Sequence, residues 1–113
     1  MRLPAAERAY VDPAKVRDYL LSPVHPEGQF KAAFFRNLGY SRARWPRLQR
    51  DLERLASSDG AIPAALTVFG QLFELRVMLR GPSDRERPVV TVWIIRREED
   101  FPRFVTAYPG VPQ

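Results

Sequence analysis

The spacing of apolar residues changes once along this chain, at Asp59-Gly60, and that change limits the folds it can adopt. Before this point, apolar residues recur three or four positions apart, which is typical of helices buried on one side. Between Gln71 and Arg80, apolar and polar residues alternate, which is the pattern of a strand with one buried face. Helices followed by strands predict an α+β fold.

Two helices are predicted in the first forty residues or so of the chain. The first begins at Asp12-Pro13, because Asp12 can cap the free backbone amides and proline suits the first helical position. It ends at Ser22-Pro23. The second begins at His25-Pro26, runs to about Leu38 and has Gly39 as its C-terminal cap.

A third helix is predicted after Ser41, and it ends in the stretch before Gly60. Its apolar stripe consists of Trp45, Leu48, Leu52 and Leu55. The stripe of the second helix consists of Phe30, Phe34 and Leu38, and Phe35 widens this apolar face. We expect Phe34 and Trp45 to be buried, since each lies on such a stripe.

The second half of the chain predicts three antiparallel strands. They are Gln71–Arg80, a central strand at Val89–Ile95 and a last strand at Arg103–Tyr108, with a further short strand near Leu66–Phe69. We therefore expect N-terminal helices packed on one face of a three- to four-stranded antiparallel sheet. Residues 1–113 are expected to form a single domain, helical from about 12 to 58 and β-sheet from about 66 to 108.

Composition excludes several classes of site. The chain has no cysteine and one histidine, His25, so it has no disulfide, no thiolate zinc site and no metal site that needs two histidines. No cofactor is expected. The sequence also lacks the run of about 20 apolar residues that a membrane helix needs, and its N-terminus has no apolar signal core. We expect a soluble, cytoplasmic protein that does not contact a membrane.

The charge of the chain is compatible with binding to nucleic acid. The chain has eighteen Lys and Arg residues and thirteen Asp and Glu residues, which gives a net charge of +5. Only Lys15 and Lys31 are lysines. Arginine binds phosphate through two parallel hydrogen bonds and stacks on bases. Four arginines recur on one side of the third helix: Arg44, Arg47, Arg50 and Arg54. This arginine ridge can follow a phosphate backbone, or it is an ordinary solvated helix face that Asp51 and Glu53 partly neutralise.

Two residues near the start of the second helix are candidates for catalysis. His25 is the one side chain whose ordinary pKa lies near neutrality, so general acid or base chemistry would use it first; the alternative is a capping or surface role. Lys31 can stabilise negative charge on a phosphate near the helix N-terminus. Its alternative is an ion pair with Glu27, four residues earlier.

The outer face of the sheet offers a second group of polar residues. Alternation turns Glu74 and Arg76 away from the helices, together with Met78 and Arg80. Depending on register, neighbouring strands add Thr91 with Trp93, and Thr106 with Tyr108. Such a face suits a metal-independent ribonuclease, in which a base removes the 2′-hydroxyl proton, cations hold the phosphate and an aromatic ring stacks on a base. Ordinary cross-strand pairing is the alternative.

Several blocks of the sequence resemble one bacterial family. The most specific are the HPxGxxKA block at His25–Ala32 and the closing VTAYP at Val105–Pro109, and the resemblance spans nearly the whole chain. Members of that family occur as small stand-alone proteins and as C-terminal domains of large polymorphic toxins. Because this chain begins at Met1 without a delivery module, we expect either an intracellular toxin of a toxin–antitoxin pair or a domesticated copy with another role.

Helices followed by an antiparallel meander that ends in a Thr-x-Tyr strand also resemble the BECR ribonuclease-toxin superfamily, which includes barnase, EndoU, colicin-type and RelE-type nucleases. This resemblance implies metal-independent RNA cleavage, and the positions it points to are His25, Lys31, Arg76, Thr106 and Tyr108. The implied partners are RNA and an acidic antitoxin or immunity protein. The alternative is a non-catalytic module that binds nucleic acid or another protein.

Overall fold

The computed structural model describes residues 1–110, apart from the side chain of Phe30. The helical segments are η1 (Ala6–Arg8), α1 (Pro13–Lys15), η2 (Val16–Leu20), α2 (Gln29–Asn37), η3 (Arg42–Arg44) and α3 (Trp45–Leu55). The strands are β1 (Ala61–Leu66), β2 (Gly70–Arg80), β3 (Glu86–Arg96) and β4 (Arg103–Pro109). The predicted α+β fold is confirmed.

Asp12 starts the first helix as the sequence predicts. Its carboxylate accepts a hydrogen bond of 2.9 Å from the backbone N–H of Ala14, and Pro13 occupies the first helical position. α1 then continues into η2, a wider π-helical turn that ends at Leu20. Turns of this kind are rare and are frequently found at functional sites.

The second helix begins later than expected, at Gln29. The imidazole Nδ1 of His25 accepts hydrogen bonds of 3.0 Å from the backbone N–H groups of Glu27 and Gly28, which holds this segment in a turn. The helix ends as predicted at Gly39, whose φ of 99° is in the left-handed region that favours glycine.

The buried stripe of α2 differs from the expected one. Phe35 and Leu38 are fully buried, whereas Phe34 is only partly buried. The buried part of the expected apolar face is thus the edge that carries Phe35, which lies about 100° around the helix from Phe34. Trp45 is also only partly buried, and the guanidinium of Arg17 lies 5.7 Å from its ring centre. The prediction that Phe34 and Trp45 are core residues was therefore wrong, and the side chain of Phe30 lies outside the described part.

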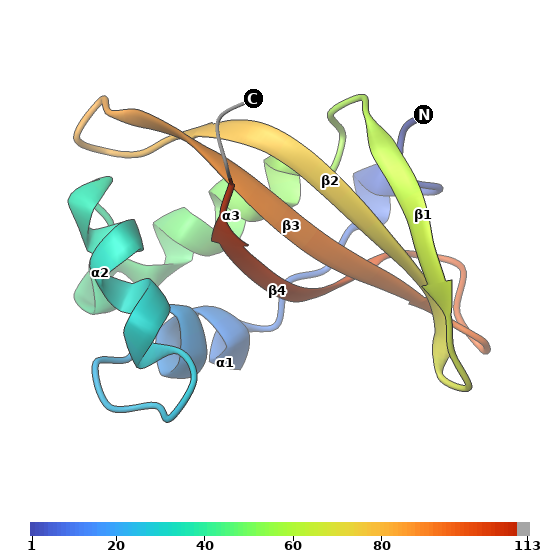
Figure 1. Cartoon of the computed structure of the whole chain (residues 1–113), viewed down its shortest axis with the longest axis horizontal. Coiled ribbons are helices and arrows are strands. Elements are labelled where there is room, and N and C mark those ends of the chain that lie inside the picture. The colour runs from blue at the N-terminus through green and yellow to red at the C-terminus, as the bar shows by residue number, and fades with distance from the viewer. Residues whose placement is uncertain (111–113) are drawn as a thin grey trace.

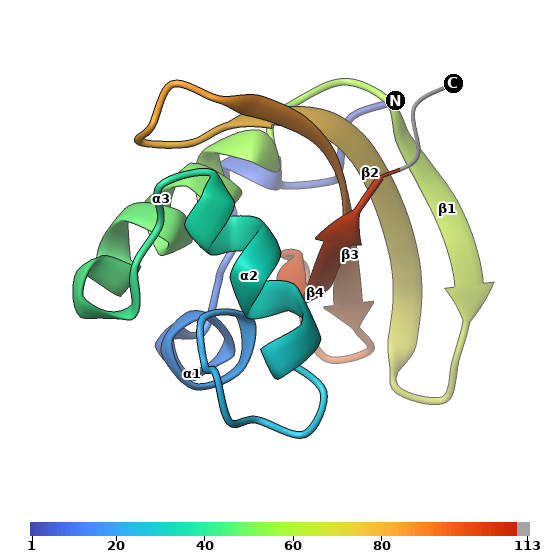
Figure 2. The same ribbon diagram turned by 60° about the vertical axis from the view of Figure 1, so that its left-hand side comes forward.

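The four strands form one antiparallel sheet in the order β1-β2-β3-β4. The fourth strand is β1, which lies earlier than the short strand expected near residues 66–69; residues 67–69 form the hairpin turn instead. α3 lies behind the sheet in Figure 1, while α1 and α2 lie beside the edge strand β4; Figure 2 shows the sheet curving around the helices. Within residues 1–110, no helix is long and apolar enough to cross a membrane.

The register decides which strand residues face the helices. Phe73 and Leu75 of β2 are buried on the helix side, and they pair with Trp93 and Thr91 of β3. Thr91 and Trp93 are therefore core residues, contrary to the expectation that they share the outer face. Their polar groups are satisfied internally, because the indole N–H of Trp93 donates to Thr91 Oγ1 at 2.8 Å and Thr91 donates to the Leu75 carbonyl at 3.1 Å.

The opposite side of the sheet, which we call the open face, carries the strand residues that point away from the helices. Glu74 and Arg76 pair with Val92 and Val90, and these two in turn pair with Thr106 and Tyr108 of β4. Residues directly opposite each other in an antiparallel pair point to the same face. Glu74, Arg76, Thr106 and Tyr108 therefore share the open face, as the alternation predicted.

Candidate functional site

Lys31, Tyr19 and Thr106 meet where the open face ends at β4. The ammonium group of Lys31 donates hydrogen bonds to the Tyr19 hydroxyl and to Thr106 Oγ1, the latter at 2.8 Å. The Tyr19 hydroxyl and Thr106 Oγ1 are 2.9 Å apart. We call these three residues the lysine cluster. Each comes from a different element, namely α2, η2 and β4.

Gly28 allows α2 to begin close to η2. A Cβ atom on this residue would lie 1.8 Å from the carbonyl oxygen of Tyr19, a distance that no side chain tolerates. The start of α2 therefore packs directly on the backbone of Tyr19, and Lys31 follows in the first turn of that helix. Glycine at this position brings the ammonium group within reach of the tyrosine hydroxyl.

The position of Thr106 depends on an irregularity in β4. Val92 pairs with Thr106 and Trp93 pairs with Phe104, so Val105 has no partner in β3. An extra residue of this kind bends an edge strand and redirects its side chains. Here it places Thr106 on the open face next to the helices.

The surroundings of Tyr19 lower its pKa. Burial of the ring opposes ionisation, but hydrogen bonds from Lys31 and Thr106 and the charge of Lys31 outweigh it, so the pKa of Tyr19 is lowered from its usual value. Shifted pKa values of this kind are frequent among groups that transfer protons. The sequence alone does not single out Tyr19 as a site residue, because its helical spacing from Val16 and Leu20 is equally typical of a packing residue.

His25 combines its turn-stabilising role with a place beside the lysine cluster. Its ring lies 5.0 Å from the Tyr19 ring, centre to centre, in an edge-on arrangement. Because Nδ1 accepts two backbone hydrogen bonds, the neutral imidazole carries its proton on Nε2. His25 and Lys31 are thus joined through Tyr19. The alternative for Lys31, an ion pair with Glu27, is absent from the described residues.

Glu74 and Tyr108 extend the polar surface across β3. The Tyr108 hydroxyl lies 3.5 Å from a carboxylate oxygen of Glu74, which is a long contact. Arg76 is exposed two residues further along β2 and lines a separate cavity of about 300 Å³ with Met78 and Val90. Contacts thus connect His25, Tyr19, Lys31 and Thr106 in one group and Glu74 with Tyr108 in another.

The arginine ridge lies elsewhere. Arg44 is the last residue of η3, and the other three arginines belong to α3, which is behind the sheet when the open face is in view (Figure 1). Arg44, Arg47 and Arg50 line a cavity of about 500 Å³. Arg47 is partly neutralised, because its Nε bonds at 3.0 Å to the buried carboxylate of Asp51, which also accepts from Tyr40 at 2.7 Å. The side chains of Arg44, Arg50 and Arg54 are exposed.

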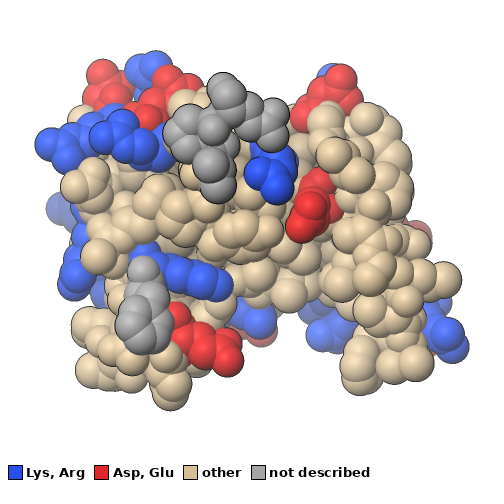
Figure 3. Space-filling view, viewed as in Figure 1, with Lys and Arg blue, Asp and Glu red and all other residues tan. Residues whose placement is uncertain are grey.

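Charged side chains are unevenly spread over the open face. Figure 3 shows most visible Lys and Arg side chains toward the left and lower right of this face, with cationic and acidic side chains beside each other near its upper centre. Within residues 1–110, no three His, Asp or Glu side chains are grouped so that they could hold a metal ion.

A family model for a domain of unknown function, DUF6883, matches residues 2–111. The chain belongs to the DUF6883 family. The search of curated proteins found no match to this DUF6883 chain.

The fold of this DUF6883 protein resembles a solved structure. A chain of a contact-dependent growth inhibition toxin–immunity protein complex from Klebsiella pneumoniae 342 superposes with a TM-score of 0.68 at 14% sequence identity. The match covers 89% of this chain and 99% of that chain. At this identity the similarity establishes a shared fold.

Proposed function

We propose that this protein is a metal-independent endoribonuclease of the toxin type. The observation that carries the proposal is the meeting of Lys31, Tyr19 and Thr106 at one edge of the open face, with His25 packed on Tyr19. This arrangement places a fixed positive charge, a hydroxyl of lowered pKa and an imidazole together. RNA cleavage by phosphoryl transfer needs groups of these kinds.

In the proposed reaction, the 2′-oxygen of RNA forms a bond to the adjacent phosphorus, and the bond from phosphorus to the 5′-oxygen of the next nucleotide breaks. Tyr19 in its phenolate form accepts the 2′-hydroxyl proton. The leaving 5′-oxygen takes a proton from water, while Nε2–H of His25 donates a hydrogen bond to that oxygen. Lys31 stabilises the negative charge on the phosphate oxygens, and Thr106 orients Lys31. Glu74, Arg76 and Tyr108 contact the substrate further along the open face.

The toxin part of the proposal is supported by the shared fold with a chain from a toxin–immunity protein complex. RNA as substrate is supported by the net charge of +5. By the same argument, the neutralising partner is an acidic antitoxin or immunity protein. The site of action is the cytoplasm, where the RNA is.

Cleavage of a single-stranded RNA in excess EDTA tests the proposal. The wild-type protein should produce fragments that end in 2′,3′-cyclic phosphate. Lys31→Met and Tyr19→Phe should each lower the rate by ~10²–10⁴-fold. Tyr40→Phe is a matched control, because the Tyr40 hydroxyl bonds to Asp51 and lies outside the lysine cluster.

Two outcomes would contradict the enzymatic proposal. One is the absence of cleavage by the wild-type protein in EDTA, and the other is an undiminished rate in Lys31→Met. If RNA is bound but not cleaved, the protein is a non-catalytic nucleic-acid-binding module, which the exposed arginines of α3 favour.

A further inference from the structure

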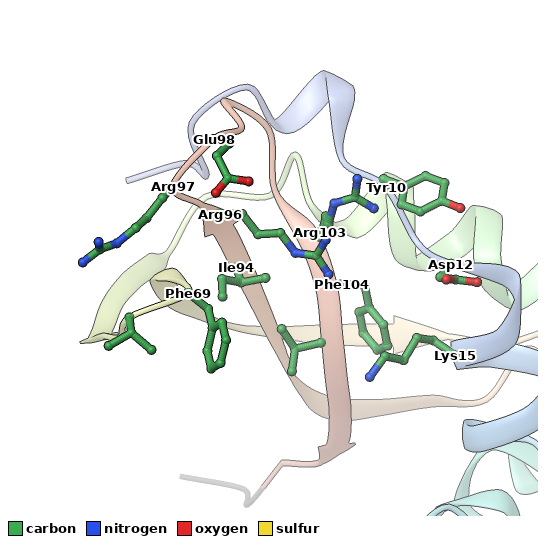
Figure 4. Close-up of a pocket in the computed structure, with 12 residues that line it drawn as sticks. Tyr10, Asp12, Lys15, Phe69, Ile94, Arg96, Arg97, Glu98, Arg103 and Phe104 are labelled. Carbon is green, nitrogen blue, oxygen red and sulfur yellow. The ribbon is translucent and has the colours of Figure 1, made fainter.

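A second cavity lies on the open face, between the β1–β2 hairpin and α1. Its volume is about 490 Å³. Figure 4 shows its lining, which comes from the hairpin turn, the ends of β3 and β4, and the segment around α1.

Positive charge predominates in this cavity. Four cationic residues line it, namely Lys15, Arg96, Arg97 and Arg103, against the two acidic residues Asp12 and Glu98. Glu99 holds Arg103 through two hydrogen bonds of 2.7 Å, and the Asp12 carboxylate caps α1. Within residues 1–110, Lys15 and Arg96 form no ion pair. The cavity therefore presents cations that an anionic ligand can neutralise.

An exposed aromatic ring stands at the same cavity. Phe69 is 73% exposed at the tip of the β1–β2 hairpin. Its backbone is held in place, because its N–H donates to Thr67 Oγ1 at 3.1 Å and its carbonyl accepts from Arg97 N–H at 3.2 Å. An aromatic ring on a fixed turn beside cations can stack on an unpaired base.

The cavity adjoins the lysine cluster. Lys15, which lines the cavity, places its ammonium group 5.6 Å from the ring centre of Tyr19. Val105 also lines it and directly precedes Thr106 in β4. A strand of RNA bound at the lysine cluster can therefore continue into the cavity.

We propose that this cavity is a subsite for an unpaired nucleotide of single-stranded RNA, with its base stacked on Phe69 and its phosphate held by Lys15 and Arg96. This inference rests on the RNA-directed function proposed above and adds the class of substrate, since a duplex would not offer a free base face.

The test measures the affinity of the full chain carrying Lys31→Met, which leaves the RNA uncut. The probes are a short fluorescein-labelled single-stranded RNA and an abasic ribose-phosphate oligomer of the same length. Phe69→Ala should weaken RNA binding about 5- to 150-fold and leave binding of the abasic oligomer unchanged. Arg96→Gln should weaken binding of both probes and lower the salt slope by about 1.

Two matched controls accompany these variants. Leu66→Ala removes an apolar side chain that is 75% exposed near the same hairpin turn but does not line the cavity. Arg87→Gln removes an exposed arginine at the other end of β3. Neither should change binding of RNA by more than a small factor.

The subsite is overturned if the parent binds no RNA, if Phe69→Ala binds RNA as the parent does, or if Leu66→Ala has the same effect as Phe69→Ala. The last result would show that the apolar surface of the hairpin as a whole affects RNA binding, and not a base stacked on Phe69. If the wild-type chain cleaves RNA and Phe69→Ala changes neither affinity nor KM, the proposed function stands without the subsite. If binding depends on Phe69 and Arg96 but nothing is cleaved, the subsite stands without the enzyme.

Discussion

The ammonium nitrogen of Lys31 lies 2.8 Å from Oγ1 of Thr106, although 75 residues separate the two in the chain. The contact joins the first turn of α2 to the edge strand β4 and has the hydroxyl of Tyr19 as its third member. It therefore fixes the distance between the helical part and the open face of the sheet at the point where we place the reaction.

Removing the charge of Lys31 should raise the pKa of Tyr19. Hydrogen bonds and charge from Lys31 lower that pKa in the folded protein, so folding favours the phenolate. The stability this contributes is present above the unfolded pKa of about 10 and is lost as pH falls through the lowered folded pKa. The ultraviolet absorbance of phenolate, measured against pH, reports the lowest tyrosine pKa of the protein. We expect this pKa to be higher in Lys31→Met than in the wild type.

Lys15→Met is the matched control for this titration, because Lys15 lies near the Tyr19 ring but does not bond to its hydroxyl. Tyr40 should ionise last in every variant, since burial and the carboxylate of Asp51 raise its pKa. If the lowest tyrosine pKa is the same in Lys31→Met as in the wild type, Lys31 does not act on Tyr19.

Gly28→Ala should separate α2 from η2. The added Cβ would lie 1.8 Å from the carbonyl oxygen of Tyr19, so the helix must move, at a cost of ~1–3 kcal/mol in unfolding free energy. The lowest tyrosine pKa should rise, as it does in Lys31→Met. Gly60→Ala is the control: a Cβ there meets no atom within 4 Å, and only its φ of 101° costs ~1–2 kcal/mol. Equal titrations in the two alanine variants would contradict the role given to Gly28.

Two adjacent phenylalanines should differ in their contribution to stability. Phe35 is fully buried, so Phe35→Ala should lower the unfolding free energy by ~3–5 kcal/mol. Phe34 is only partly buried, so Phe34→Ala should cost clearly less. Urea denaturation of both variants compares them, and equal losses would show that the two side chains share the core.

Replacing Arg44 and Arg50 by Gln tests the arginine ridge. Both side chains are exposed, and unlike Arg47 neither bonds to Asp51 in the described residues. If the ridge follows the RNA backbone, affinity should fall for all sequences and the salt slope should drop by about 1 for each arginine. Arg87→Gln serves as the control. Unchanged affinity and slope in the double variant would remove the ridge from the RNA interface.

Local sequence signals predicted the parts of the fold that depend on neighbours in the chain. Asp12 caps α1, and Gly39 ends α2 with a positive φ, because capping and turn conformations are set within a few residues. Alternation in β2 correctly turned Glu74 and Arg76 to the open face. The expected apolar face of α2 included both Phe34 and Phe35, and their spacing alone does not decide which of the two is buried.

Taken by itself, the sequence determined that helices precede strands. The period of apolar residues changes at Asp59-Gly60, and backbone geometry sets a different period for a helix and for a strand. Tertiary structure alone decided that Thr91 and Trp93 enter the core, since the face of a strand residue depends on pairing with a strand far along the chain. It also decided that Tyr19 joins Lys31 and Thr106. That meeting requires the close approach at Gly28 and the unpaired Val105, and neither is visible until distant segments pack against each other.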